Sequence, residues 1–189
     1  MHRSHKSVFH KEVECFFSAR HIKKVNWSEW GAPTFIRTKK NGTVRFLSDF
    51  RKLYKRIRRK TFPIPKIQYM LLNMEGFKYA SSLDLNMGYY HIESSPGYKW
   101  LCTIVLPWGK YEYQKLPMGV CNSSYIFQGK ISKLFEGFDM LRAYIDDVLV
   151  VTKNNFKKHL KSLYRVLQRL AQGWLKVNAE KSFFGKTET

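Results

Sequence analysis

The first alternation of apolar and polar residues lies near the start of the chain. TFIRTKK and TVRFLSDF, both rich in β-branched and aromatic residues, flank Asn41-Gly42, a dipeptide that favours tight hairpin turns. The pattern predicts a β-hairpin with a basic tip. Residues 37–60 hold eleven lysines or arginines against one acid, so the hairpin suits contact with phosphates, although most charge runs are simply solvated loops.

Further strand patterns follow this hairpin. FKYASSLDL predicts a strand, and TIVLPWGKYEYQKL, which turns at Gly109, predicts a second hairpin. AYIDDVLVV consists of two short apolar runs around a pair of aspartates, and it predicts a strand, a tight turn and another strand. Its apolar arms indicate a buried sheet.

Three segments have helical spacing. A short helix is predicted from Pro65 to Gly76, and a second from Asn122 to Phe138 with Asn122 or Ser123 as its N-cap. The third segment is amphipathic, and the core is predicted to hold its apolar residues Phe156, Leu160, Leu163, Leu167 and Leu170. The order of elements predicts an α+β fold in which helices pack on one face of an antiparallel sheet.

The composition of the chain indicates the kind of partner that it binds. The 189 residues suffice for one domain or two small lobes, and 34 basic against 14 acidic side chains give a net charge of +20. Because such a chain repels itself without a polyanion, and because 16% of its residues are aromatic, nucleic acid is the expected partner. Three cysteines without C-x-x-C spacing suggest neither a disulfide framework nor a zinc site. Without a signal peptide or membrane span, the protein is predicted to be intracellular, cytoplasmic or nuclear, and not secreted.

The candidate chemistry lies in the aspartates, of which the chain has only five. Asp146 and Asp147 are adjacent within the most apolar stretch, where two anions resist burial unless cations neutralise them; an ordinary Asp-containing turn is about equally consistent with this pair alone. Asp84 ends the strand SSLDL with no adjacent base, and it favours the metal site. Three carboxylates from two strands can hold two Mg²⁺ ions, or Mn²⁺, for phosphoryl transfer.

The order of these motifs gives a resemblance. SSLDLNMGYYHI, LPWGKYEYQKLPMGVCNSSYIFQ and AYIDDVLV resemble motifs A, B and C of reverse transcriptases. Upstream, SEWGAPTFIRTKKNGTVRFLSDFRKL and FPIP resemble the gypsy-type long-terminal-repeat retrotransposons. The resemblance implies a palm-and-fingers polymerase fold and an RNA-directed DNA polymerase. It would use an RNA template, a DNA or RNA primer and deoxynucleoside triphosphates, as a retrotransposon enzyme in virus-like particles or the nucleus.

The resemblance assigns roles around the aspartates. It implies that Asp84, Asp146 and Asp147 are metal ligands and that the Leu85 carbonyl is a further ligand. Tyr89, five residues after Asp84, matches the steric gate that excludes a 2′-hydroxyl, while a core tyrosine is the plainer alternative.

In the first hairpin, the resemblance implies contacts with nucleotide and template. Lys39 or Lys40, together with Arg45, matches residues that grip the triphosphate. Asp49 and Arg51 match a segment on the template strand, and a structural Asp–Arg pair is an almost equal alternative.

Motif B and the segments after it supply the remaining roles. Met118 and Gly119 match residues packed against the nucleotide, with Gly119 as a close-approach glycine. Gln128 and Tyr144 match template- or primer-binding positions, although Gln128 could equally lie on a helix surface. Lys181 matches the lysine that protonates pyrophosphate, with an exposed lysine as the default alternative.

The resemblance also sets expectations for domains. Residues 1–27 are expected to form a helical or extended lead-in and 28–189 the fingers and palm, without thumb or ribonuclease H. Protease, ribonuclease H and integrase are expected polyprotein neighbours. Ser124 stands where the family usually has proline. The alternatives are a non-catalytic nucleic-acid-binding remnant and an RNA-templated RNA polymerase.

Overall fold

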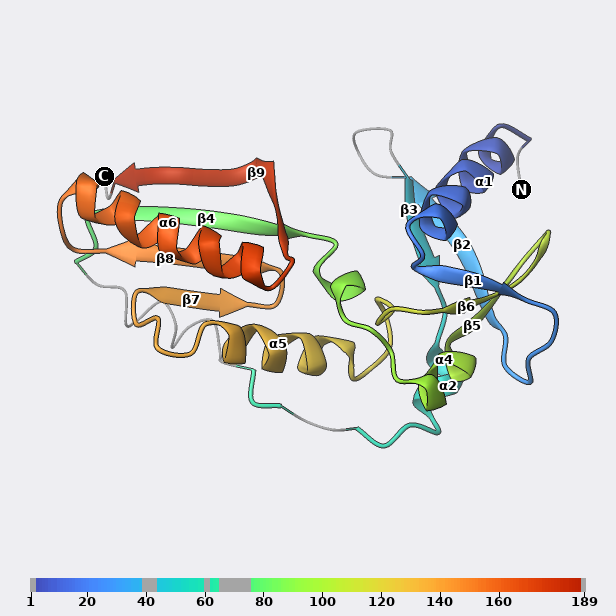
Figure 1. The fold of residues 1–189 in the computed structure, drawn as a ribbon. Helices are drawn as coiled ribbons and strands as arrows, with labels where there is room; N and C mark the ends of the chain where they lie inside the picture. The colour runs from blue at the N-terminus through green and yellow to red at the C-terminus, as the bar shows by residue number, and fades with distance from the viewer. Residues whose placement is uncertain (1–2, 39–43, 60–61, 65–75, 188–189) are drawn as a thin grey trace. The chain divides into compact units, whose positions relative to one another are not determined.

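The computed structural model describes residues 3–38, 44–59, 62–64 and 76–187 (Figure 1). The chain divides into two compact units. Unit 1 comprises Met1–Arg59 and Ile92–Ser123, and unit 2 comprises Lys60–His91 and Ser124–Thr189. None of the described helices combines the length and the apolar character that a membrane span needs.

Unit 1 is built on a five-stranded sheet. Its strands, in spatial order, are β1 (Ile22–Val25), β6 (Gly109–Tyr113), β5 (Thr103–Leu106), β2 (Ala32–Thr38) and β3 (Val44–Ser48). All neighbours are antiparallel except β2 and β5, which are parallel. The β2–β3 and β5–β6 pairings confirm both predicted hairpins, while the turn at 39–43 lies outside the described residues.

Helices cover parts of this sheet. Besides α1 (Arg3–Ser18), unit 1 contains short helices at α2 (Arg51–Tyr54), α4 (Pro96–Lys99) and η2 (Trp100–Cys102). The α1 ring of Phe9 lies 5.8 Å from Phe46 and 5.3 Å from Trp108. The first 27 residues, expected as a lead-in, thus supply a packed helix and the strand β1, which pairs with β6.

Unit 2 is built on a four-stranded antiparallel sheet. Its spatial order is β7 (Leu141–Tyr144), β8 (Asp147–Thr152), β4 (Tyr79–Asn86) and β9 (Lys176–Thr187). These strands confirm the predictions for FKYASSLDL and AYIDDVLVV. The 3₁₀ turn η1 (Gly88–His91) follows β4. In Figure 1, α6 (Phe156–Gln172) runs along this sheet.

The other predicted helices have different outcomes. Helix α5 spans Ser123–Leu134 and confirms the helix expected from Asn122, but it ends four residues early, before Gly137 at a φ of 81°. Ser123 is the first residue of the helix, so Asn122 takes the N-cap position, and the Ser123 hydroxyl donates to the Pro117 carbonyl at 2.7 Å. The helix predicted from Pro65 to Gly76 lies outside the described residues, except for its last position.

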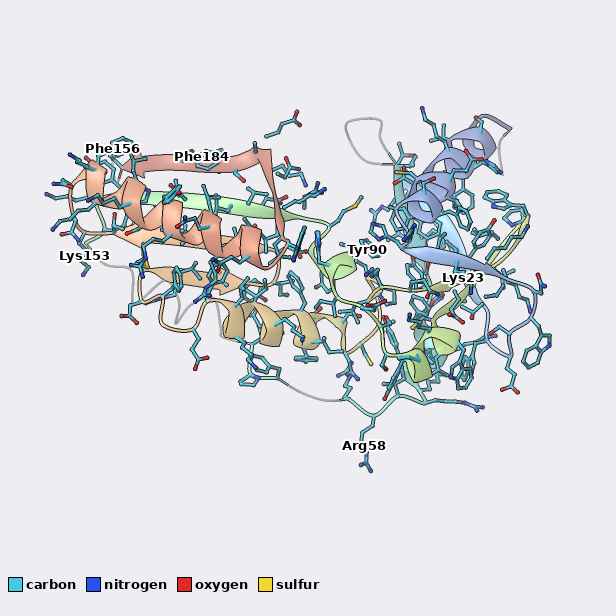
Figure 2. All side chains as sticks on the ribbon, viewed as in Figure 1. Lys23, Arg58, Tyr90, Lys153, Phe156 and Phe184 are labelled. Atoms are coloured by element: carbon cyan, nitrogen blue, oxygen red, sulfur yellow. The ribbon has the colours of Figure 1, made fainter. Side chains whose placement is uncertain are left out.

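The predicted core face of α6 was partly wrong. Leu163 and Leu170 are buried as expected, but Phe156, Leu160 and Leu167 are 46%, 47% and 36% exposed. Figure 2 shows Phe156 at one end of α6. The apolar arc of the helix is wider than the strip that the sheet covers, and the buried row is His159, Leu163, Val166 and Leu170.

His159 occupies that core position because two hydroxyls satisfy its ring. Its Nε2 lies 2.8 Å from Ser81 Oγ, and its Nδ1 lies 2.9 Å from Thr152 Oγ1. One ring nitrogen of a neutral imidazole donates and the other accepts, so the two hydroxyls suit the neutral form. Burial lowers the pKa of His159.

This burial predicts a pH-dependent stability. As pH falls below about 6.5, the unfolded histidine binds a proton that folded His159 resists, so the free energy of unfolding should drop by up to about 1.4 kcal/mol per pH unit. The contribution is complete above the unfolded pKa and is lost as pH falls. Urea denaturation between pH 5 and 7.5 should show a shallower profile for His159→Gln. Parallel profiles for the two proteins would contradict it.

Candidate carboxylate site

Two of the candidate aspartates face each other across neighbouring strands. Asp84 of β4 is the direct register partner of Asp147 of β8, and Tyr144 of β7 is the partner of Asp147. Directly paired residues point to the same face of a sheet, so these three share one face. The alternate residues Leu83 and Val148 point to the opposite, fully buried face. Because like charges directly opposite repel, this pair costs stability unless a cation lies near it.

Asp146 lies in the turn between β7 and β8. The preceding residue, Ile145, has a φ of 52°, which is rare for a β-branched residue and strains the turn. The Asp146 carbonyl accepts a hydrogen bond from the Leu85 N–H at 2.8 Å, which ties the turn to β4. The side-chain Oδ1 of Asp146 is buried and has no hydrogen-bond partner among the described residues.

The surroundings of Asp146 disfavour its charge. Burial, followed by the neighbouring carboxylates of Asp147 and Asp84, raises the pKa of Asp146 to about 6, while Lys181 acts in the opposite direction. Gly88 leaves room for the carboxylate, because a Cβ on that residue would lie 3.2 Å from Asp146 Oδ1 and 2.5 Å from Phe127 Cζ. Alanine therefore does not fit at position 88 without a shift of Phe127.

The Gln128 amide holds the strained turn. Its Oε1 accepts from the Ile145 N–H at 2.7 Å, and its Nε2 donates to the Ala143 carbonyl at 3.0 Å. The side chain is 1% exposed, so the expected helix-surface alternative is wrong. This burial favours a role in positioning the turn over direct contact with a template. The sequence did not indicate this role, because the partners are 15 and 17 residues away along the chain.

A lysine from β9 approaches the carboxylates. Lys181 Nζ lies 3.7 Å from Asp84 Oδ1, and most of the lysine side chain is exposed. The neighbouring Ser182 hydroxyl accepts from the Asp84 N–H at 3.1 Å and donates to the Asn178 carbonyl at 2.6 Å. Lys181 is therefore both the exposed lysine of one alternative and a partner of the aspartate cluster.

Tyr89 is fixed beside this cluster. Its ring stacks on Phe127 at 4.9 Å and an interplanar angle of 23°, and its hydroxyl lies 3.2 Å from Ser124 Oγ. The residue is 7% exposed, and burial raises its pKa. Both contacts involve α5, so Tyr89 cannot turn without disturbing that helix.

Asp49 and Arg51 form a bidentate pair in unit 1. Arg51 Nε lies 2.9 Å from each Asp49 carboxylate oxygen, and Arg51 Nη2 lies 2.6 Å from Oδ2. Arg51 lowers the pKa of Asp49 to about 2. The structural Asp–Arg pair therefore exists, with the exposed Arg51 at its solvent side.

The remaining predicted residues of unit 1 are less defined. Arg45 lies on β3 with Arg37 as its backbone partner, its side chain is outside the described set, and Lys39 and Lys40 lie outside the described residues. Met118 is exposed. Gly119 leaves room for a Cβ within the protein, because such an atom would meet its nearest neighbour, the Ser48 carbonyl oxygen, at 3.6 Å. Its φ of 91° is what requires glycine.

The carboxylate cluster has the donor chemistry of a divalent-metal site. In the described part of the chain, no three His, Cys, Asp or Glu side chains converge into a ready ligand group. Asp84 instead faces Lys181, and Asp146 keeps an unbonded buried oxygen. Hard cations such as Mg²⁺ prefer carboxylate and carbonyl oxygens, so the cluster fits such an ion. Asp146 Oδ1 is the acceptor that a cation would satisfy.

Comparisons with known proteins match this chain to one protein family and to two transposon polyproteins. The family described as reverse transcriptase (RNA-dependent DNA polymerase) matches residues 37–189. The Pol polyproteins of the transposons gypsy and opus from Drosophila melanogaster are 31% and 34% identical over 84% and 85% of this chain. The chain spans only 16% and 17% of those two relatives.

Solved structures show the same fold. The protease-reverse transcriptase of prototype foamy virus superposes with a TM-score of 0.91 at 23% identity, over 98% of this chain and 25% of that one. A foamy viral protease-reverse transcriptase in complex with an RNA/DNA hybrid gives 0.89 at 21% identity, over 97% of this chain and 25% of that one. The α+β polymerase fold predicted from the sequence is confirmed.

Proposed function

Because this chain belongs to the reverse transcriptase (RNA-dependent DNA polymerase) family, we propose that it is the part of a gypsy-type Pol polyprotein that extends a primer 3′-hydroxyl with deoxynucleotides on an RNA template. The pairing of Asp84 with Asp147, beside the unbonded oxygen of Asp146, is the observation that carries the proposal. Unit 2 serves as the palm and unit 1 as the fingers. The retrotransposon polyprotein would act inside the cell, in virus-like particles or the nucleus, beside protease, ribonuclease H and integrase segments.

The palm residues divide the work at the reacting end of the primer. Asp84, Asp146 and Asp147, with the Leu85 carbonyl, would hold two Mg²⁺ or Mn²⁺ ions. Such ions, when bound, activate the attacking hydroxyl and neutralise the leaving pyrophosphate. The Lys181 ammonium would donate a proton to the pyrophosphate, and its position 3.7 Å from Asp84 Oδ1 supports that role.

The other residues position the substrates. Lys39 or Lys40, together with Arg45, would bind the triphosphate, and Met118 and Gly119 would pack against the nucleotide. The RNA/DNA hybrid named for the foamy viral structure supports nucleic acid as the partner, and the charge of +20 favours it. Template and primer would lie against Arg51, held by Asp49, and against Tyr144, which shares the face of Asp84.

Primer extension tests the proposal. The purified chain, alone or joined to the downstream part of its polyprotein, should extend a DNA primer annealed to RNA when Mg²⁺ and deoxynucleotides are present. Removal of the metal with EDTA should stop extension, and added excess Mg²⁺ should restore it. A nucleic-acid-binding remnant predicts binding without any extension in either form, and that result would reject catalysis.

Tyr89 predicts which sugar is accepted. We expect Tyr89→Ala to raise ribonucleotide incorporation relative to deoxynucleotide incorporation by roughly 10–200-fold, the range that shape alone gives to a pocket. Tyr89→Phe keeps the ring on Phe127 and should retain selectivity, and Tyr164→Ala, at an exposed tyrosine of α6, is the matched control. Single-nucleotide extension measures kcat/KM for both substrates. Equal use of both sugars by the unaltered chain would favour the RNA polymerase alternative.

A further inference from the structure

A second charged surface lies on unit 2, on residues that the carboxylate site does not use. A shallow, open depression of about 480 Å³ lies between α5 and α6, and its lining consists of Lys130, Lys133, Leu134, Glu136 and Arg169. Lys130 and Lys133 are exposed, whereas Gln128 on the same helix is buried under the carboxylate turn. One side of α5 therefore faces the carboxylate turn, and another side carries the exposed lysines. We call this depression the α5–α6 pocket.

An aromatic ring orders the arginines beside the pocket. The guanidinium carbons of Arg165 and Arg169 lie 5.5 and 5.6 Å from the ring centroid of Phe138. Arg169 Nη1 also donates to Gln172 Oε1 at 3.4 Å. Stacking on a ring fixes the plane of a guanidinium and leaves its N–H edge free to bind an anion. The arginines are thus positioned before any ligand arrives.

The charges around the pocket are not balanced within the protein. Four cations, Lys130, Lys133, Arg165 and Arg169, gather there, and Glu136 is the one acid in the lining. Among the described residues, none of the four cations forms an ion pair within 4.0 Å. Like charges held close together repel each other, and a bound polyanion relieves that repulsion.

We propose that the α5–α6 pocket binds the phosphodiester backbone of a nucleic acid strand outside the carboxylate site. Planar guanidiniums bind phosphate oxygens in a bidentate manner, and lysines add charge without demanding a fixed geometry. An acidic protein segment is the weaker fit, because Leu134 is the single apolar residue in the lining and gives little for an apolar anchor to contact. This binding does not require polymerisation, so the proposal can hold even if the chain is catalytically inactive.

Salt dependence measures this binding directly. Binding of a fluorescent 20-nucleotide oligouridylate to the full chain is followed by anisotropy over a range of KCl concentrations. Each phosphate of a single strand that a lysine neutralises adds roughly 0.7 to the steepness of log K against log salt, so Lys130→Gln/Lys133→Gln should reduce that steepness by about 1.4. Lys130→Arg/Lys133→Arg, which keeps both charges, should retain the slope.

A matched double variant separates a built site from general charge. Lys153→Gln/Lys186→Gln removes two exposed lysines from the end of unit 2 where α6 begins, at the opposite end of that helix from Arg169, and should leave the slope unchanged. Equal slopes for the two glutamine variants would overturn the proposal. A second result would also overturn the proposal. In that result a polyglutamate peptide loses binding in Lys130→Gln/Lys133→Gln, while the salt slope for oligouridylate is the same as in the unaltered chain. Circular dichroism checks that each variant folds.

Discussion

Asp146→Asn is expected to abolish Mg²⁺-dependent primer extension and, at the same time, to stabilise the metal-free fold. Asp146 carries a buried oxygen without a partner among the described residues, next to two further carboxylates. The amide removes one negative charge from this cluster without changing the shape of the side chain. Repulsion with Asp84 and Asp147 then falls, while an amide oxygen is a much poorer ligand for two divalent ions.

The two effects have different sizes. Loss of charge stabilisation at a reacting centre costs a factor of roughly 10³ or more, so extension should fall to background. The repulsion is partly screened by solvent, and its relief should raise the free energy of unfolding by about 1–2 kcal/mol. Single-turnover extension and urea denaturation without metal measure the two quantities.

Asp139→Asn is the matched control for this prediction. Asp139 lies on the turn before β7, away from the paired carboxylates, so neither extension nor stability should change. If Asp146→Asn extends a primer as fast as Asp139→Asn, Asp146 is not a metal ligand. If it destabilises the fold instead, the buried oxygen has a partner that the cluster geometry does not reveal.

The sequence predicted the strands that carry the aspartates because strand patterns are local. Alternation in FKYASSLDL and the two apolar arms of AYIDDVLVV fix which residues face the core, and a shared face for Asp84 and Asp147 follows once the strands pair. Neither segment alone predicts that the two strands pair. The expectation that Asp84 and Asp147 lie together came from the resemblance to a family.

The sequence did not predict the polar contacts made across long separations. His159 is a polar residue at a core position of α6. It can be buried there because Ser81 of β4 and Thr152 of β8 are hydrogen-bond partners of its ring nitrogens. The apolar periodicity of the helix instead predicted Phe156 and Leu160 as core residues. The Tyr89–Ser124 contact was equally hidden, since a family with proline at that position has no hydroxyl to offer.

Substitution of Gln128 distinguishes two roles for this residue, which are positioning of the β7–β8 turn and contact with the template. Gln128→Leu removes both hydrogen bonds to the β7–β8 turn and leaves the Ile145 N–H and the Ala143 carbonyl without partners, at a cost of about 2–4 kcal/mol in the free energy of unfolding. Ile145, with its φ of 52°, should then relax, and misplacement of Asp146 and Asp147 by about 1 Å should lower kcat by roughly 100-fold.

Two variants and one kinetic readout decide the role of Gln128. Gln128→Glu keeps an acceptor for the Ile145 N–H and should lose less stability than Gln128→Leu, while Gln168→Leu, at an exposed glutamine of α6, should change neither stability nor extension. A residue that positions the turn lowers kcat and leaves the KM for template and primer unchanged. A residue that binds template raises that KM and spares stability, because its contact exists only in the complex. A raised KM with unaltered stability would therefore restore the template-binding role predicted from the sequence, despite the burial of the side chain.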